Sequence, residues 1–300
     1  MNKIPKKVIL TGATGLIGKE TIEPFLKNEF EIFALTIDGD YSDRKIHWID
    51  ANIFDHARVK EVMMQIQPEY LLHFAWTAQG DYLTSDSNYN WLDSSYIMLK
   101  EFINYGGKRA VFAGTCAEYE FQDRPLKESD RLKPSTLYAK CKNELREKAQ
   151  SVCTQNGVSF GWGRIFYVYG HGENPTRLTP YVVDSLMKNK KVTIKSGPLV
   201  KDYMYTKDTA SAFVKFLNTN VEGCVNICTA NPIRVRDFVL NIATKMQKDH
   251  LIEFIDECQN QPTFIVGDNS RLKNEVGYEI MYTLDDAISE ILDKVGAKEI

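Results

Sequence analysis

The sequence lacks a long apolar segment, a charge excess and any region of low complexity. No run of about 18 apolar residues occurs, so no transmembrane helix is predicted. The 37 basic and 40 acidic side chains give a formal net charge of -3, without the basic surface typical of nucleic-acid-binding proteins. No signal-peptide core precedes the first glycine motif. We therefore expect a cytoplasmic protein with neither membrane nor nucleic-acid partners.

The six cysteines are too scattered to predict a metal centre or a disulfide framework. Cys224 and Cys228 form a CxxxC pair, with no second pair and no adjacent histidine. A structural zinc ion requires four clustered ligands, and disulfides are rare in a reducing compartment. We therefore predict buried free thiols and no metal site.

Short apolar runs alternate with helical patterns over the first half of the 300-residue chain. The predicted strands are 7–10, 31–37, 46–49, 70–76, 109–113 and 158–169. The helical patterns between them cover 18–27, 57–65, 90–105 and 135–156. This rhythm predicts an α/β fold, a Rossmann-like doubly wound parallel sheet with helices on both faces.

The pattern becomes less regular after residue 170. We predict a dinucleotide-binding domain at 1–169, to which 203–228 partly returns. A smaller, irregular C-terminal substrate lobe is predicted from 170–202 and 229–300. The crevice between the two is the expected ligand site.

A glycine-rich segment, TGATGLIG, lies between the first predicted strand and the first predicted helix. Gly12 permits a tight turn, Gly15 lets the backbone approach a pyrophosphate, and Gly18 permits close helix packing. The order strand, motif, helix favours a dinucleotide site over a packing turn without a ligand. Gly12, Thr14, Gly15 and Gly18 are the candidate cofactor residues of this loop.

The end of the second strand bears on the choice between NAD and NADP. An acidic residue there binds the ribose diol of NAD, whereas a neutral residue with a nearby Arg or Lys accommodates the 2′-phosphate of NADP. Thr36 stands at this position, followed by Asp38 and, in the next loop, Arg44. The missing carboxylate favours NADP(H) over NAD(H), although Asp38 could still bind the ribose.

A YxxxK motif places Tyr138 and Lys142 on one face of a predicted helix. A free tyrosine has a pKa near 10, and a neighbouring ammonium lowers it towards the range useful for acid–base catalysis. Thr115 follows the strand 109–113, where its hydroxyl can bond the substrate oxygen that the tyrosine protonates. The three residues form the candidate catalytic set.

Together these motifs resemble the extended short-chain dehydrogenase/reductase family, and within it the nucleotide-sugar epimerases, dehydratases and 4-ketoreductases. The resemblance runs from Val8 to about Tyr278. It is carried by TGATGLIG, LLHFA at 71–75, Thr115, YAKCK at 138–142, RIFYVYG at 164–170 and KDYMYTKD at 201–208.

The resemblance implies roles for individual residues. Tyr138 would be the acid–base, Lys142 its activator and Thr115 the substrate-hydroxyl partner. Tyr138 and Lys142 would also contact the cofactor, since the lysine ammonium can hydrogen-bond the nicotinamide ribose. Further cofactor contacts would come from Leu16 and Ile17 at the pyrophosphate, Asn52 and Ile53 at the adenine, Phe74, Ala75 and Trp76 in the dinucleotide groove, Asn90, and Phe166 near the nicotinamide. The substrate, a nucleotide-diphosphate sugar, would meet Thr115, Tyr167, Arg177 and Lys201. For Arg177 and Lys201 the alternative is a solvated surface cation.

The family supports several reactions. Its 4,6-dehydratases carry an Asp-Glu pair after the Ser/Thr, and here those positions are Cys116 and Ala117. Glu118 comes one residue later and on a strand would face the other side. A 4-ketoreductase is favoured because Thr36 suits NADPH. A 4-epimerase with tightly bound NAD is the alternative. A dehydratase and a non-catalytic dinucleotide-binding protein are less favoured.

The family also implies a homodimer formed by helix packing. One stripe of the predicted helix 135–156 is apolar, and it comprises Leu137, Cys141, Leu145, Ala149 and Val152. The same stripe would also serve as intramolecular core.

Overall fold

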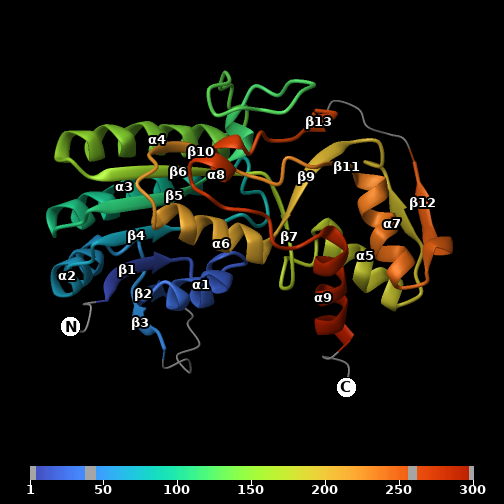
Figure 1. The fold of residues 1–300 in the computed structure, drawn as a ribbon, viewed down its shortest axis with the longest axis horizontal. Coiled ribbons are helices and arrows are strands. Elements are labelled where there is room, and N and C mark those ends of the chain that lie inside the picture. The colour runs from blue at the N-terminus through green and yellow to red at the C-terminus, as the bar shows by residue number, and fades with distance from the viewer. Residues whose placement is uncertain (1–4, 38–44, 256–261, 297–300) are drawn as a thin grey trace.

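The computed structural model describes residues 5–37, 45–255 and 262–296. Its larger part is a seven-stranded sheet in the order β10-β6-β5-β4-β1-β2-β3, and every pairing in it is parallel (Figure 1). The strands are β1 (Lys6–Thr11), β2 (Phe30–Thr36), β3 (His47–Asp50), β4 (Tyr70–His73), β5 (Arg109–Thr115), β6 (Ser159–Ile165) and β10 (Gly223–Ile227). The predicted Rossmann-like α/β fold is confirmed.

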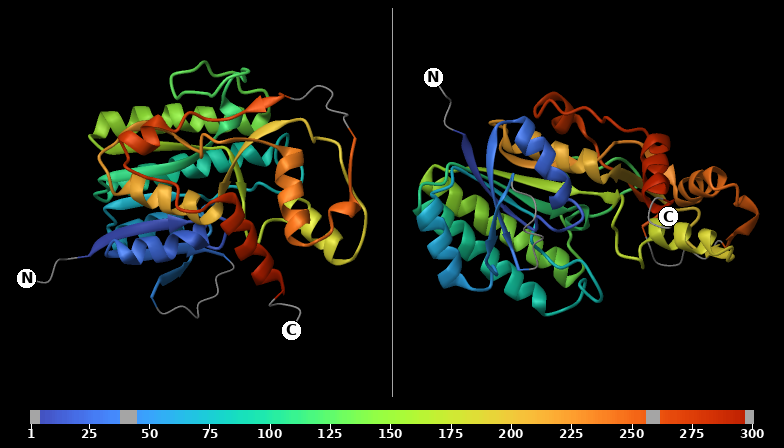
Figure 2. Two further views of the ribbon diagram at one scale, coloured as in Figure 1. Left: turned by 45° about the vertical axis from the view of Figure 1, so that its right-hand side comes forward. Right: turned by 90° about the horizontal axis from the view of Figure 1, so that it is seen from below.

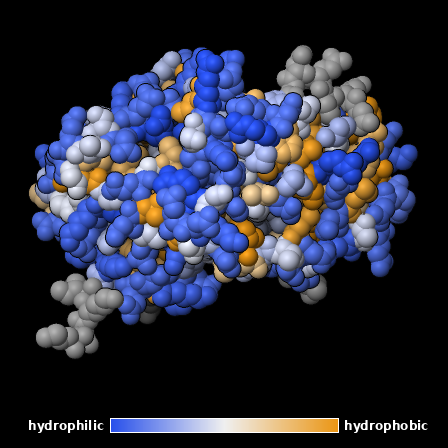
Figure 3. Space-filling view, turned by 45° about the horizontal axis from the view of Figure 1, so that its top comes forward, coloured by the Kyte–Doolittle hydropathy of each residue, from blue (hydrophilic) through white to orange (hydrophobic). Residues whose placement is uncertain are grey.

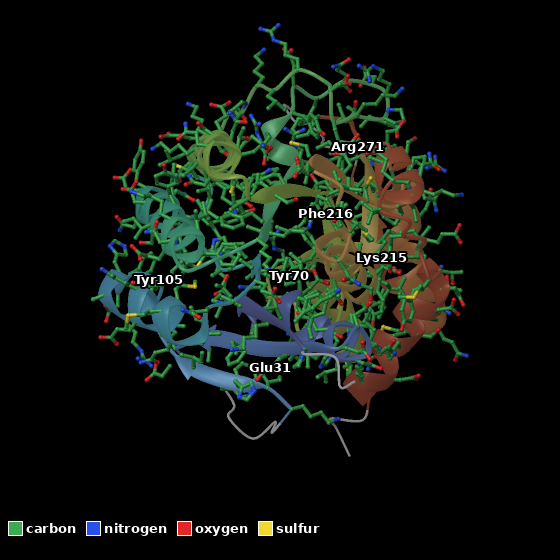
Figure 4. The ribbon with its side chains drawn as sticks, turned by 60° about the vertical axis from the view of Figure 1, so that its left-hand side comes forward. Glu31, Tyr70, Tyr105, Lys215, Phe216 and Arg271 are labelled. Carbon is green, nitrogen blue, oxygen red and sulfur yellow. The ribbon has the colours of Figure 1, made fainter. Side chains whose placement is uncertain are left out.

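Helices cover both faces of this sheet. Alternate residues of a strand point to opposite faces, so the buried strands present apolar side chains on both. Val8 and Leu10 of β1 belong to one hydrophobic cluster, and Ile9 to the other. One face carries η1 (Gly18–Thr21), α1 (Ile22–Lys27), α6 (Thr206–Leu217) and α8 (Ser270–Asn274). The other carries α2 (His56–Ile66), α3 (Ser87–Asn104) and α4 (Leu137–Asn156), as the view from below in Figure 2 shows. Figure 4 labels Phe216 of α6 on the first side and Tyr105, just after α3, on the second.

The remaining elements form a smaller lobe with its own hydrophobic cluster. A four-stranded sheet joins β7 (Tyr167–Tyr169), β9 (Val200–Tyr205), β11 (Pro232–Arg234) and β13 (Phe264–Ile265). A two-stranded sheet joins β8 (Val192–Ile194) and β12 (Ile252–Phe254). The helices here are α5 (Leu178–Met187), α7 (Val235–Lys245), η3 (Asp249–Leu251) and α9 (Leu284–Gly296), while η2 (Cys116–Glu118) follows β5 of the large sheet.

Local chemistry explains where the main helices begin and end. Asp55 begins α2 by accepting a hydrogen bond from the Arg58 backbone N–H at 3.0 Å, and Thr136 begins α4 in the same way with Ala139 at 3.2 Å. Gly157 ends α4 at φ 66°, a left-handed conformation that favours glycine. The candidate catalytic residues Tyr138 and Lys142 therefore lie in the first turns of a well-defined helix.

The predicted strand 158–169 is wrong in one respect, because the structure divides it at Phe166. β6 stays in the large sheet beside β5, whereas β7 pairs with β9 of the small sheet. The chain thus passes from one lobe to the other next to the end of β5. The segment 203–228 is divided too, since β10 lies in the large sheet and Tyr203 in β9 of the small one. The domain boundaries as such stay a prediction.

The character of the surface, the helices and the cysteines bears on three expectations from the sequence. Hydrophilic side chains predominate on the face shown in Figure 3, and apolar ones gather over the smaller lobe at its right. Within the described ranges, no helix has both the length and the apolar character needed to cross a bilayer. Cys116, Cys141, Cys153 and Cys228 are buried free thiols, Cys224 is half-buried, and Cys258 lies outside the described residues.

Candidate active site

The glycine loop has the close contacts that its sequence predicts. Gly12 adopts φ 69°, and the Gly15 N–H donates to its carbonyl at 3.0 Å. A Cβ atom on Gly18 would lie 2.0 Å from that same carbonyl oxygen, and a Cβ atom on Gly12 would lie 2.9 Å from the Ala75 nitrogen. Gly12 and Gly18 are thus required by packing. Gly15 and Thr14 are exposed beside the half-buried Leu16 and Ile17, where a phosphate could approach.

The predicted adenosine residues gather at the ends of β2 and β3. Thr36 is buried and lies in register with Asp50. Ile53 is buried, whereas Asn52 is exposed and its Oδ1 accepts a hydrogen bond from the Phe54 backbone at 3.0 Å. Asp38 and Arg44, on which the choice of cofactor depends, lie outside the described residues.

The residues predicted to line the groove after β4 divide between the two faces of the sheet. The ring of Phe74 packs against Phe213 of α6, with 4.8 Å between centroids. Ala75 and Trp76 lie on the opposite face, with α3 and α4. Just before them, His73 bonds the hydroxyl of Thr11 at 2.7 Å and that of Ser95 at 2.8 Å, and burial holds its pKa well below the usual value. His73 is therefore a neutral structural link, as its place in the buried strand predicts.

Thr115, Tyr138 and Lys142 come together at the carboxyl end of β5. Thr115 is the last residue of β5, and Tyr138 and Lys142 lie one turn apart in α4. Burial raises the pKa of Tyr138 above its usual value, against the effect of a side-chain hydrogen bond with Thr115. The arrangement therefore presents a protonated phenol beside a threonine hydroxyl.

Lys142 is placed differently from the prediction. Its Nζ donates to the Ala113 carbonyl at 2.9 Å and lies 4.0 Å from the centre of the Trp76 ring, but 6.0 Å from that of Tyr138. Burial lowers the pKa of Lys142 to about 7, with Glu118 acting in the opposite sense. The predicted lowering of the Tyr138 pKa is therefore wrong for this arrangement, because burial of the phenol outweighs any effect of the ammonium.

Two residues of this region were missed by the sequence reasoning. Asn88 is buried, and its Oδ1 accepts a hydrogen bond from Trp76 Nε1 at 2.9 Å. Tyr82 packs edge-on against Tyr138, with 5.1 Å between ring centroids. Asn90, the asparagine that the family resemblance implied as a cofactor contact, is exposed on α3. No local pattern distinguishes Asn88 from Asn90, since only the packing of α3 turns one of them inward.

Glu118 also departs from expectation, because 116–118 form a 3-10 turn and not an extended strand. The turn directs the carboxylate inward, where it is fully buried and accepts hydrogen bonds from the Thr115 backbone at 3.0 Å and from Trp162 Nε1 at 3.0 Å. It forms an ion pair with the buried Arg164 at 2.8 Å. Glu118 thus fixes the end of β5 that carries Thr115.

The predicted substrate residues Tyr167, Arg177 and Lys201 belong to the small lobe. Lys201 is buried, with its Nζ 4.9 Å from the centre of the Tyr167 ring, so the surface-cation alternative is wrong for it. Arg177 is exposed and lies 5.8 Å from the centre of the Tyr82 ring. Phe166 is buried between the lobes and 6.4 Å from the Tyr119 ring. Two cations and several tyrosines thus flank the candidate catalytic residues.

Comparison with known proteins identifies the class that this fold and site define. The NAD dependent epimerase/dehydratase family model matches residues 8–228, and the chain belongs to this family. It is an enzyme of the extended short-chain dehydrogenase/reductase type, as the sequence motifs predicted.

Individual relatives are distant. The chain is 24% identical to dTDP-6-deoxy-L-talose 4-dehydrogenase (NAD(+)) of Aggregatibacter actinomycetemcomitans, over 77% of this chain and 87% of the relative. It is 23% identical to dTDP-4-dehydro-6-deoxyglucose reductase of Escherichia coli, over 97% and 98%. Its fold is similar to that of UDP-glucose 4-epimerase from Thermotoga maritima, with a TM-score of 0.88, 18% identity, and coverage of 96% of this chain and 99% of that one.

Proposed function

We propose that this enzyme is an NAD(P)-dependent 4-ketoreductase acting on a nucleotide-activated sugar. The observation that carries the proposal is the half-buried Tyr138, whose pKa is raised, beside Thr115 at the end of β5. A bound reduced nicotinamide supplies the hydride that reaches C4 of the sugar. Tyr138 donates its phenolic proton to the C4 oxygen, Thr115 holds that oxygen, and the products are the 4-alcohol and the oxidised cofactor.

The raised pKa of Tyr138 favours the reductive direction. A phenol that keeps its proton at neutral pH is ready to donate to the oxygen on which negative charge develops. Oxidation of a sugar hydroxyl, which begins an epimerase cycle, requires the phenolate instead. An epimerase cycle also contains a reductive half that uses the phenol, so the state of Tyr138 fits the reductase and also that half of the alternative 4-epimerase cycle.

A dehydratase has less support because suitable acid–base groups are missing after Thr115. Burial raises the pKa of the Cys116 thiol to about 12, and Ala117 has no titratable group. The Glu118 carboxylate already accepts hydrogen bonds from Thr115 and Trp162 and forms an ion pair with Arg164. We therefore assign no acid–base pair for the elimination of water to the residues that follow Thr115.

The substrate we propose is a nucleoside-diphosphate 4-keto-6-deoxysugar. Two relatives act, by their names, at C4 of dTDP-linked 6-deoxysugars. Lys201 and Arg177 supply positive charge for a diphosphate, and the aromatic rings of Tyr82 and Tyr167 suit the apolar face of a deoxysugar. Thr115 and Tyr138 would meet the sugar at C4.

For the cofactor we propose the loop 12–18, Thr36, Asn52, Ile53 and the residues after β4 as its binding surface. The family description and the first relative's name specify NAD, so the preference for NADP(H) that Thr36 suggests rests on the sequence alone. Mass spectrometry of the nucleotide released from denatured protein, with titration by NADPH and NADH, decides between them. A preference for NADPH of ten-fold or more corresponds to about 1.4 kcal/mol.

The homodimer and the cytoplasmic location also stay proposals. The apolar stripe that suggested a dimer is largely core within one chain, since Cys141, Leu145 and Ala149 are buried against α3 and the sheet. Any dimer contact of α4 must therefore use its outer face.

The proposed reaction is tested with dTDP-4-keto-6-deoxyglucose as the substrate and with NADPH or NADH, by following loss of the reduced-nicotinamide absorbance. We expect stoichiometric oxidation of the cofactor. Tyr138→Phe should lower kcat by about 10²- to 10⁴-fold while leaving cofactor affinity unchanged, because it removes only the transferred proton. Tyr105→Phe, which alters a half-buried tyrosine after α3, serves as the matched control. Full activity of Tyr138→Phe would contradict the assignment.

A further inference from the structure

The contact between Lys142 and Trp76 is not explained by the proposed acid–base chemistry alone. The Lys142 Nζ lies 4.0 Å from the centre of the Trp76 ring, well within the distance at which a cation is attracted by an aromatic face. Lys142 is buried, so the ring replaces water that would otherwise solvate the ammonium. Its second partner is the neutral Ala113 carbonyl at 2.9 Å.

The indole is itself held in a fixed orientation. Trp76 Nε1 donates to Asn88 Oδ1 at 2.9 Å. The Asn88 amide donates in turn to the carbonyls of Tyr82 at 2.7 Å and Ser85 at 2.8 Å, which ties α3 to the loop beside Tyr138. Trp76 also stacks with Trp91, with 6.2 Å between centroids and 27° between planes.

Few other charged or titratable groups act on Lys142. Glu118 favours the ammonium from a distance while it is paired with Arg164, and Tyr138 is protonated. His73, which is buried and neutral, is influenced by the lysine charge. Among the contacts of Lys142 within the described ranges, the indole face and the Ala113 carbonyl are therefore the ones that stabilise the ammonium.

We propose that Trp76 is a positioning residue whose indole, held by Asn88, keeps the Lys142 ammonium charged and fixed one helical turn from Tyr138. Loss of the ring removes the attraction that offsets part of the burial cost, so Lys142 gives up its proton at lower pH. The link to catalysis rests on the proposed function, whereas the contact and its effect on Lys142 do not.

The test uses the cofactor-free protein with lysines carrying ¹³C at Cε, observed by NMR across a pH titration. The Lys142 resonance is assigned by its loss in Lys142→Met. We expect its ε-protons to be shifted upfield by the indole ring current. In Trp76→Leu this upfield shift should disappear, and the apparent pKa of Lys142 should fall by roughly 0.5 to 1 unit. Trp91→Leu, which removes a stacking neighbour but keeps the Trp76 ring, should retain most of the upfield shift and lower the Lys142 pKa by less than Trp76→Leu does.

A second variant distinguishes loss of the aromatic ring from a general loss of structure in Trp76→Leu. Trp76→Phe keeps an aromatic face but removes the Nε1 donor, and it should retain part of the upfield shift. Lys142 signals that are the same in the wild type, Trp76→Leu and Trp76→Phe would overturn the proposal. An equal pKa change in Trp91→Leu would overturn it as well.

Activity then separates this proposal from the proposed function. If both hold, the pH above which kcat declines should fall in Trp76→Leu by the same amount as the Lys142 pKa, a change that a purely structural defect would not produce. If the protein reduces no keto sugar, the NMR result still decides the role of Trp76.

Discussion

The buried pair of Glu118 and Arg164 gives the prediction whose size follows most directly from the structure. The Glu118 side chain is 0% exposed and that of Arg164 is 2% exposed, and their atoms approach to 2.8 Å. Burial alone would lower the pKa of Arg164, but Glu118 raises it above its usual value. Glu118→Gln keeps the shape of the side chain and an oxygen for the Thr115 backbone, yet leaves the guanidinium without a counter-charge.

Removing one partner of a buried ion pair typically costs 3–5 kcal/mol. Because the single amide oxygen cannot replace both carboxylate oxygens, the glutamine NH2 group would face the Arg164 Nε–H, and we expect a loss of about 3–5 kcal/mol in the free energy of unfolding. The assay is urea unfolding followed by circular dichroism, with the midpoints compared at a common slope. Glu147→Gln, which alters a 63%-exposed partner of Arg146, should cost less than about 1 kcal/mol.

A double variant isolates the charge. Glu118→Gln combined with Arg164→Met removes both members of the pair, and it should be more stable than Glu118→Gln alone because no unpaired charge remains. A Glu118→Gln protein as stable as the Glu147→Gln control would refute the reasoning, and so would a double variant in which the two losses simply add.

Two further predictions concern the glycine loop and the buried lysine. Gly18→Ala should destabilise the protein and abolish dinucleotide binding, because its Cβ would lie 2.0 Å from the Gly12 carbonyl oxygen. Gly15→Ala, whose Cβ would lie 3.1 Å from the same oxygen, should fold and lose mainly cofactor affinity, as calorimetric titration with NADH and NADPH would show. Lys142→Met should inactivate the enzyme yet raise its unfolding free energy by about 2 kcal/mol at or below pH 7, because it removes a buried charge. The pKa of Lys142 falls from 10.5 to about 7 on folding, so the folded state binds fewer protons between these values. The burial penalty is therefore complete below pH 7, and the advantage of Lys142→Met should shrink as the pH rises towards 10. An advantage that grows with pH would show that Lys142 is not buried as a charge.

The features that the sequence predicted are those set by short stretches of chain. TGATGLIG defines its turn through contacts within the loop, such as that between Gly18 and Gly12. The spacing of Tyr138 and Lys142 requires only one helix, and Thr115 needs only the end of a buried strand. Alternating strands and helices were enough to predict the parallel sheet.

The features that were missed depend on distant packing. The strand predicted at 158–169 divides at Phe166 because β7 pairs with β9, whose residues follow more than thirty positions later. Glu118 turns inward because Trp162 and Arg164 of the next strand supply its partners. The direction of Lys142 depends on the Trp76 ring, which is itself fixed by Asn88. None of these contacts leaves a local pattern in the sequence.

The central claim is net reduction at C4 with Tyr138 as the proton donor, and a labelled hydride tests it most directly. The protein is incubated with dTDP-4-keto-6-deoxyglucose and reduced cofactor carrying deuterium at the transferable position of the nicotinamide, and the product is examined by NMR and mass spectrometry. The account predicts one deuterium at C4 of the sugar for each cofactor oxidised, and none with Tyr138→Phe. Recovery of the 4-keto sugar with no cofactor oxidised, or reduction that places no deuterium at C4, would contradict it.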